Sequence, residues 1–453
     1  MADLSATQRI ALAELLARCS TPMLTQVDAM AAGMSGQRAR VLRQLAAKEA
    51  RNRERRDLVL GPLDPLFAPR ADGLPGLSFP AAVRGRLWVT AIGHEPGLLG
   101  QLDRGDQVSR TVADRLCLSA AMDLRDHPDR VWPGANRAEI ESLAACLDLI
   151  GVLRRHLGHM EDWLRGGTAE ATAALTYAMK QAATISPEGP RRLLEILFAH
   201  TREARLFLRL LGQVMPLVGR EPHVTEEDIS LFTARLVEAV QARARAIMDF
   251  DCLSPEGDLR ALRAHLAWSS EILAEFDAST LVRADATAGS ALRQVRQDVS
   301  RFLSDLYMDA EQTVLALLPI ESSVLAGRMK RPVPRLDMPA DEAVVAKARV
   351  LLAVVSMSRG PALVFGRESD RRQTAEGLTW RLASWADEAI ERVNEGLLAD
   401  ENLACRRIAM TADLLALIDA REAARSIRRR LMASGVKREH LRPATTGASP
   451  RFA

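Results

Sequence analysis

Apolar residues recur at intervals of three and four along most of this chain, the spacing that places side chains on one face of an α-helix. The longest such stripes lie in residues 136–164, 186–214, 225–247 and 340–357. Three short β-prone runs, at 87–92, 333–336 and 363–365, are too isolated to build a sheet. The pattern predicts about a dozen or more helices, and hence an all-α fold that is a multi-helix bundle or an irregular helical array.

Residues 58–87 form the one long segment that cannot be helical throughout. Five prolines, from Pro62 to Pro80, remove backbone donors, and glycines loosen the backbone between them. The segment also carries many apolar side chains: Leu58, Leu60, Leu63, Leu66, Phe67, Leu74, Leu77 and Phe79. We therefore expect an extended Pro/Gly-rich strap near residues 58–87. Four of its side chains should be buried against helices that follow it: Leu66, Phe67, Leu77 and Phe79.

Helix starts can be read from capping residues. Asn136, with Glu139 three residues on, predicts a capping box. The tetrapeptide Ser-Pro-Glu-Gly occurs twice, beginning at Ser186 and at Ser254, and we expect each serine to be an N-cap whose change to Ala costs about 1 kcal/mol. The recurrence is either an internal repeat of helix pairs or the same capping chemistry used twice. The second reading is favoured, because the helices that follow do not match well.

Composition divides the chain into five segments. An N-terminal helical segment, 1–57, precedes the strap at 58–87, and a central helical domain covers 88–329. A second Pro-rich break at 330–339 opens a C-terminal helical domain, 330–441, in which two long helices, 375–398 and 401–432, are expected to pair. Residues 442–453 are predicted to be a disordered tail.

The cysteines and the apolar runs indicate a compartment. Five cysteines, far apart and without a CxxC pair, suggest free thiols in a reducing environment. The N-terminus lacks the basic and apolar regions of a secretory signal, and the longest apolar run, 350–355, is too short to span a bilayer. We expect a cytoplasmic protein with no membrane span.

The net charge of +3 is unevenly distributed. Residues 37–57 carry +5 and residues 421–453 carry +7, which leaves −9 on the remainder. Basic ends of this kind can contact nucleic-acid phosphates, dock on the protein's own acidic surface or keep the protein soluble. In the first basic helix the apolar stripe ends before the candidate residues, and in the second the three candidates are consecutive and splay around the helix. We therefore expect the candidate contact residues to stay mostly solvated. They are Arg51, Arg53, Arg55, Arg56, Arg428, Arg429 and Arg430.

Candidates for catalysis or metal binding are few. His156 and His159 have i, i+3 spacing, but the neighbouring Arg154 and Arg155 repel a cation, and no third ligand is identifiable. His200 lies on a predicted helix, as phosphorelay histidines do, yet no nucleotide-binding motif accompanies it. A GxSxG motif and a Glu-x-x-His pair are also missing from the sequence. We predict no catalytic residue, no metal site and no cofactor.

These observations favour a non-enzymatic, cytoplasmic helical scaffold or adaptor that acts through protein–protein contacts. Its partner would be an unidentified protein or a second copy of the chain. The alternative is a nucleic-acid-associated protein that uses the basic N- and C-terminal helices. A helical enzyme whose pocket carries no short motif is a third class. A partner retained at high salt would favour the scaffold, whereas nucleic acid lost with salt would favour the alternative.

Overall fold

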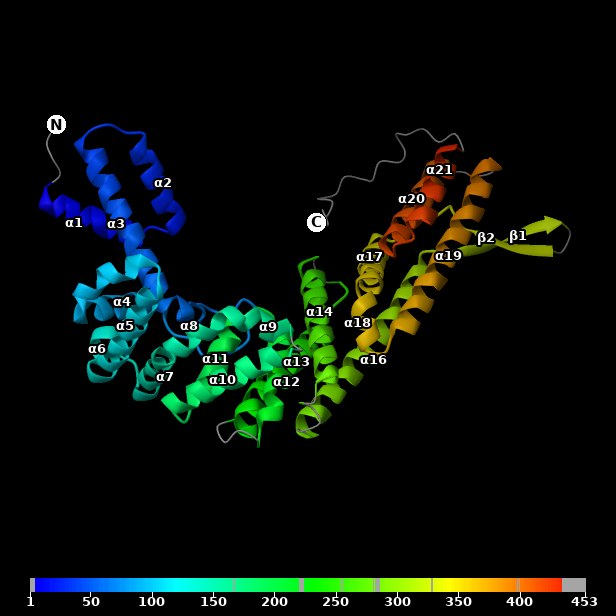
Figure 1. Cartoon of the computed structure of the whole chain (residues 1–453). Coiled ribbons are helices and arrows are strands. Elements are labelled where there is room, and N and C mark those ends of the chain that lie inside the picture. The colour runs from blue at the N-terminus through cyan, green and yellow to red at the C-terminus, as the bar shows by residue number, and fades with distance from the viewer. Residues whose placement is uncertain are drawn as a thin grey trace. The chain divides into compact units, whose positions relative to one another are not determined.

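The computed structural model describes residues 5–165, 168–219, 224–253, 256–279, 281, 286–326, 329–396, 398 and 400–433. Its many helices confirm the all-α fold (Figure 1). The chain divides into two compact units, Met1–Arg235 and Leu236–Ala453. The division falls inside helix α13 (Glu226–Met248), within the segment 88–329. Because a continuous helix crosses it, no Pro- or Gly-rich linker marks this division in the sequence.

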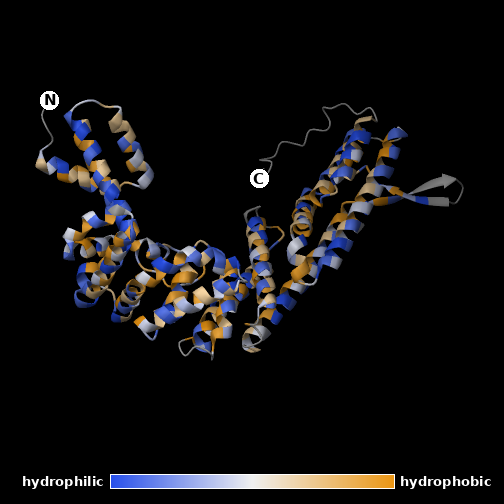
Figure 2. Ribbon diagram, viewed as in Figure 1, coloured by the Kyte–Doolittle hydropathy of each residue, from blue (hydrophilic) through white to orange (hydrophobic). Residues whose placement is uncertain are grey.

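The first unit consists of amphipathic helices, each of which carries both hydrophobic and hydrophilic residues (Figure 2). Its elements before α13 are α1 (Ala6–Arg18), α2 (Thr21–Ala32), α3 (Gln37–Leu60), η1 (Gly61–Phe67), α4 (Ala81–His94), η2 (Pro96–Arg104), α5 (Gln107–Asp126), α6 (Pro128–Val131), α7 (Arg137–Asp148), α8 (Ile150–His156), η3 (Leu157–His159), α9 (Met160–Arg165), α10 (Ala169–Ile185), α11 (Gly189–His200), α12 (Ala204–Val214) and η4 (Met215–Leu217), where η denotes a 3-10 helix. The predicted capping box at Asn136 is confirmed at the start of α7.

Helices α1, α2 and α3 pack around a small hydrophobic cluster. Its buried members are Leu16, Leu24 and Ala46, with Leu12, Val27, Leu42, Leu45 and Ala50 packed against them. Helix α3 continues beyond this cluster, and its last two residues, Val59 and Leu60, are fully buried in the rest of the unit. A single 24-residue helix thus connects the N-terminal cluster to the larger core.

The strap is shorter than predicted. Residues 58–60 complete α3, 61–67 form η1 and 81–87 lie in α4, so that only 68–80 are extended apart from a turn closed by Gly73. Pro62 is compatible with a helical conformation because it lies in the first turn of η1, where its missing N–H is not needed. The predicted burial is confirmed for Leu66, Phe67 and Phe79, whereas Leu77 is half-buried.

Polar side chains from later helices bind backbone carbonyls along this segment. His200 of α11 lies 2.7 Å from the Pro62 oxygen, and Arg154 of α8 donates to Val59 at 3.0 Å. Arg70 stacks over the Phe198 ring at 3.8 Å and donates to the Phe198 carbonyl. The acceptors are carbonyls of α3, of η1 and of the last turn of α11, so these contacts fix the segment against α8 and α11 from both sides.

The prediction that Ser186 is an N-cap is wrong. Ser186 is the C-cap of α10, and α11 begins at Gly189 after a turn. Its carbonyl accepts the Gly189 N–H at 2.9 Å, which closes that turn. Ser254 lies outside the described residues. The glycine therefore matters more than the serine, because it lets α11 start against the backbone of α10.

We predict that Gly189→Ala destabilises the protein by about 1–3 kcal/mol through overpacking. A Cβ at this position would lie 2.0 Å from the carbonyl oxygen of Ala182, which is backbone and cannot rotate away. Gly212→Ala in α12 is the matched control, since its Cβ would meet nothing within 4 Å, and it should be neutral or stabilise by up to about 1 kcal/mol. Urea denaturation of both variants tests the difference, and equal midpoints would contradict it.

Within its described residues, the second unit contains longer helices and one β-hairpin (Figure 1). Besides the second part of α13, its elements are α14 (Glu256–Ala278), α16 (Ala286–Ala316), β1 (Ile320–Ala326), β2 (Met329–Pro334), α17 (Glu342–Met357), α18 (Arg359–Val364), α19 (Glu368–Asn394), α20 (Glu401–Leu417) and α21 (Arg421–Ala433). Helices α16, α17, α19 and α20 pack on one another, and most of the second half of α17 is buried. None of the helices within the described residues combines the length and apolarity needed to cross a bilayer.

Two features of this unit differ from prediction. Strands β1 and β2 pair antiparallel, where the sequence predicted no sheet. Pro332 and Pro334 are compatible with β2 because each strand of a two-stranded hairpin has a free edge, where no backbone N–H is required. The helix predicted at 401–432 is interrupted between α20 and α21. There Asp419 adopts φ 62°, and the Ala420 N–H bonds back to the Leu415 carbonyl, the arrangement that ends helices in a Schellman motif.

Candidate functional site

Arg53, expected to be solvated, is 8% exposed. Its guanidinium donates to Glu49 at 2.9 Å and to the carbonyls of Leu16 at 3.0 Å and Cys19 at 2.7 Å. It also lies 3.3 Å from the Thr21 hydroxyl at the start of α2. The last carbonyls of a helix have no intrahelical donor, so Arg53 supplies one to the end of α1. The expectation of a solvated side chain is therefore wrong for Arg53, which is structural.

The other three arginines of this cluster differ from one another. Arg55 forms two hydrogen bonds with Asp103 of η2, at 2.8 and 2.6 Å, and these bonds lower the pKa of Asp103. Arg56 lies 3.7 Å from Asp57. Arg51 is exposed, and its Nε donates at 3.4 Å to the Ala47 carbonyl of its own helix. Of these four predicted contact residues, Arg51 alone is both exposed and without an ion pair to a described carboxylate.

The C-terminal arginines belong to the second unit, so the two clusters are described separately. Arg428 pairs with Asp413 of α20 at 2.6 Å, and Arg430 pairs with Asp387 of α19. Arg429 donates to the Arg425 carbonyl of its own helix at 3.4 Å. These contacts favour the reading in which α21 docks on acidic side chains of its own unit.

His156 and His200 have structural partners. The Nε2 of His156 lies 3.1 Å from Gln181, and its ring stacks on Trp163, while burial lowers its pKa. His159 is exposed on the 3-10 turn that follows. His200 donates from Nε2 to the Pro62 carbonyl, since a carbonyl can only accept, and burial lowers its pKa as well. Among the described residues, no group of three or more His, Cys, Asp or Glu side chains is placed to bind a metal ion.

The buried cysteines are poor nucleophiles. Burial raises the pKa of both Cys117 and Cys146 to about 12. The thiol of Cys117 also donates to the Val59 carbonyl at 3.2 Å. A thiolate is the reactive form of cysteine, so these thiols remain protonated and unreactive at neutral pH.

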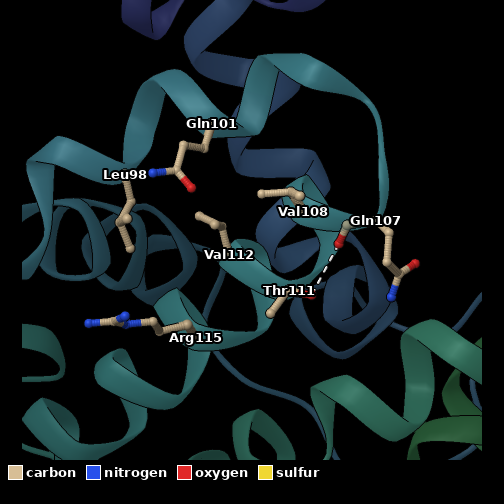
Figure 3. Close-up of a pocket in the computed structure, with 7 residues that line it drawn as sticks. All are labelled: Leu98, Gln101, Gln107, Val108, Thr111, Val112 and Arg115. Atoms are coloured by element: carbon tan, nitrogen blue, oxygen red, sulfur yellow. Dashed lines mark hydrogen bonds between the residues drawn. The ribbon is translucent and has the colours of Figure 1, made fainter.

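A groove of about 440 Å³ lies between η2 and the first half of α5 (Figure 3). In Figure 3, Leu98 and Gln101 come from η2, and the remaining labelled side chains come from α5. The lining residues are Leu98, Gln101, Gln107, Val108, Thr111, Val112 and Arg115. Arg115 is the only titratable side chain among them, and it forms an ion pair with Glu95 at 2.8 Å. The groove therefore combines apolar and uncharged polar side chains with one charged residue, and its lining contains no acid–base pair.

The groove continues as an exposed stripe along α5. Five exposed residues recur at intervals of three, four, three and four: Val108, Thr111, Arg115, Leu118 and Met122. The exposed fractions of Val108, Leu118 and Met122 are 42%, 44% and 64%, high for apolar side chains. Val112, Leu116 and Ala120 of α5 are buried. The exposed stripe was not predicted from the sequence, although its 3–4 spacing is visible there.

Comparison of the chain with protein-family models, with curated proteins and with solved structures finds no match.

Proposed function

We propose that the protein is a non-enzymatic, cytoplasmic helical adaptor, and that the stripe on α5 with its groove binds an amphipathic helix of a partner protein. The observation that carries this proposal is the 3–4 spacing of the exposed stripe. A second helix with apolar residues at the same spacing can pack its side chains between those of the stripe. From Val108 to Met122 the stripe is about 21 Å long at 1.5 Å per residue, or four turns of helix.

A partner helix fits this surface better than a second copy does. Arg115 is the middle residue of the five, so pairing the stripe with itself in register, parallel or antiparallel, would place two arginines opposite each other. Like charges in direct opposition are unfavourable. A partner helix with a small or acidic residue at its central position avoids this repulsion, and its apolar side chains can contact Leu118, Met122 and the groove.

Other features support a binding role in a reducing compartment. The five cysteines are free, and Cys117, Cys146 and Cys405 are buried as thiols. His156 and His200 are engaged in structural hydrogen bonds, and the groove lining has no nucleophile activated by a base. These observations favour recognition over catalysis as the role of the surface.

The proposal can be tested by photo-crosslinking in the native cell. A benzoylphenylalanine at position 118 should crosslink one partner protein, and the crosslinked peptide should have apolar residues at 3–4 spacing. The matched control is position 363 in the second unit, where Leu363 is 72% exposed and lies outside the stripe. A crosslink to a second copy of the chain, or the same products from both positions, would contradict the proposal.

A further inference from the structure

Helix α3 carries a line of exposed cations on the side that faces away from its hydrophobic contacts. They are Arg40, Arg43, Lys48 and Arg51. At 100° per residue they share an arc of about 140°, and they extend over about 16 Å of helix. Buried residues such as Ala46 and Arg53 lie on the other side of the helix, and Val41 lies at the edge of the cationic arc.

These four side chains are not neutralised within the protein. No ion pair joins any of them to a carboxylate of the described residues. The carboxylates nearest in sequence are engaged elsewhere, because Glu49 pairs with Arg53 and Asp57 pairs with Arg84 at 2.8 Å. Glu54 is exposed on this face, and Asp103, which pairs with Arg55, also interacts electrostatically with Arg51. The patch therefore keeps a net positive charge that is open to solvent.

We infer that this face of α3 binds the phosphate backbone of a nucleic-acid duplex without sequence preference. A duplex presents about one negative charge per 1.7 Å of its axis, so a 16 Å line of four cations can meet four phosphates. The helix is held in place by the α1–α3 cluster and by its buried end at Val59 and Leu60, so the cations are spaced before binding. This surface shares no residue with the stripe on α5.

The composition of the face selects the duplex over other polyanions. Single-stranded nucleic acid is held largely by stacking on aromatic side chains, and α3 contains none. A helix that lies on an anionic membrane inserts an apolar face, whereas between the cations this face offers only Gln44 and Ala47. Phosphate contacts alone carry no base readout, so binding should not depend on sequence.

The test is fluorescence anisotropy of the full-length protein with a labelled 20-base-pair DNA duplex of mixed sequence. We expect micromolar binding at about 50 mM salt and a slope of log K against log salt of about −3 to −4, as expected for four phosphate contacts. Changing Arg40, Arg43, Lys48 and Arg51 together to Gln should weaken binding at least ten-fold and bring the slope close to zero.

The matched control removes the same charge elsewhere. Four exposed arginines with acidic neighbours, changed together to Gln, should leave binding within about two-fold: Arg165, Arg301, Arg372 and Arg421. Equal losses of DNA affinity in both variants would show that only the net charge of the protein matters, and would overturn the inference. Failure of the natural protein to bind at 50 mM salt would also overturn it. So would tighter binding to vesicles containing phosphatidylserine than to the duplex.

Discussion

Replacing Phe79 by Ala is expected to lower the free energy of unfolding by about 3–5 kcal/mol, the usual cost of removing an enclosed aromatic ring. Phe79 is 5% exposed, and its ring lies 5.9 Å from that of Phe67 and 5.8 Å from that of Trp132. Its N–H also donates to the Leu66 carbonyl at 2.7 Å. The strap thus contributes to a buried aromatic cluster, and the surrounding helices cannot fill the cavity that the substitution would leave.

Chemical denaturation measures this loss, and Leu15→Ala provides a control. Leu15 is 60% exposed, so its truncation should change the free energy of unfolding by less than about 0.5 kcal/mol. A loss below about 1 kcal/mol in Phe79→Ala would mean that the strap is only loosely attached, against its packing and its carbonyl contacts.

Replacing Arg53 by Ala should also cost about 3–5 kcal/mol, because it removes one partner of a buried ion pair. The substitution leaves Glu49 without its cation and removes the donor from the carbonyls of Leu16 and Cys19. The effect should be concentrated in α1 and α2, whose own hydrophobic cluster is small. The substitution should therefore accelerate amide hydrogen exchange much more in residues 6–32 than in α5.

Arg51→Ala is the matched control, two residues away on the exposed side of α3. It should leave both unfolding and exchange nearly unchanged, since surface substitutions usually stay within about 0.5 kcal/mol. If the two variants behaved alike, Arg53 would be an ordinary surface arginine and its network of hydrogen bonds would be unimportant.

Local patterns in the sequence were sufficient to predict much of the fold. The 3–4 stripes predicted the helices, and Asn136 with Glu139 predicted the start of α7. The excess of apolar residues among prolines predicted that Phe67 and Phe79 are buried. Each of these depends on interactions between residues close in sequence or on the general cost of exposing apolar surface.

Long-range polar contacts were beyond such reasoning. Arg53 meets Leu16 and Cys19 across more than thirty residues, and His200 meets Pro62 across 138. In the sequence Arg53 is one of several arginines in a charged run, and nothing distinguishes it from Arg51. Which of them becomes buried is decided by where the end of α1 lies, which is a tertiary property.

The β-hairpin and the break at Asp419 were missed for another reason. Strand β2 contains two prolines, which argue against a strand inside a sheet but not against a hairpin with open edges. Asp419 adopts the left-handed conformation at the position where a glycine usually ends a helix. The sequence therefore has no glycine to mark the break, and the apolar pattern continues across it.

The most direct test of the proposed function is the affinity of the crosslinked partner for variants of α5. The double change of Leu118 and Met122 to Asp should weaken binding by about 100-fold, or roughly 2.7 kcal/mol, while the thermal midpoint stays the same because both side chains are exposed. Changing Leu363 to Asp should have no effect on binding. An unchanged affinity in the double variant would show that the partner binds elsewhere and would contradict the account.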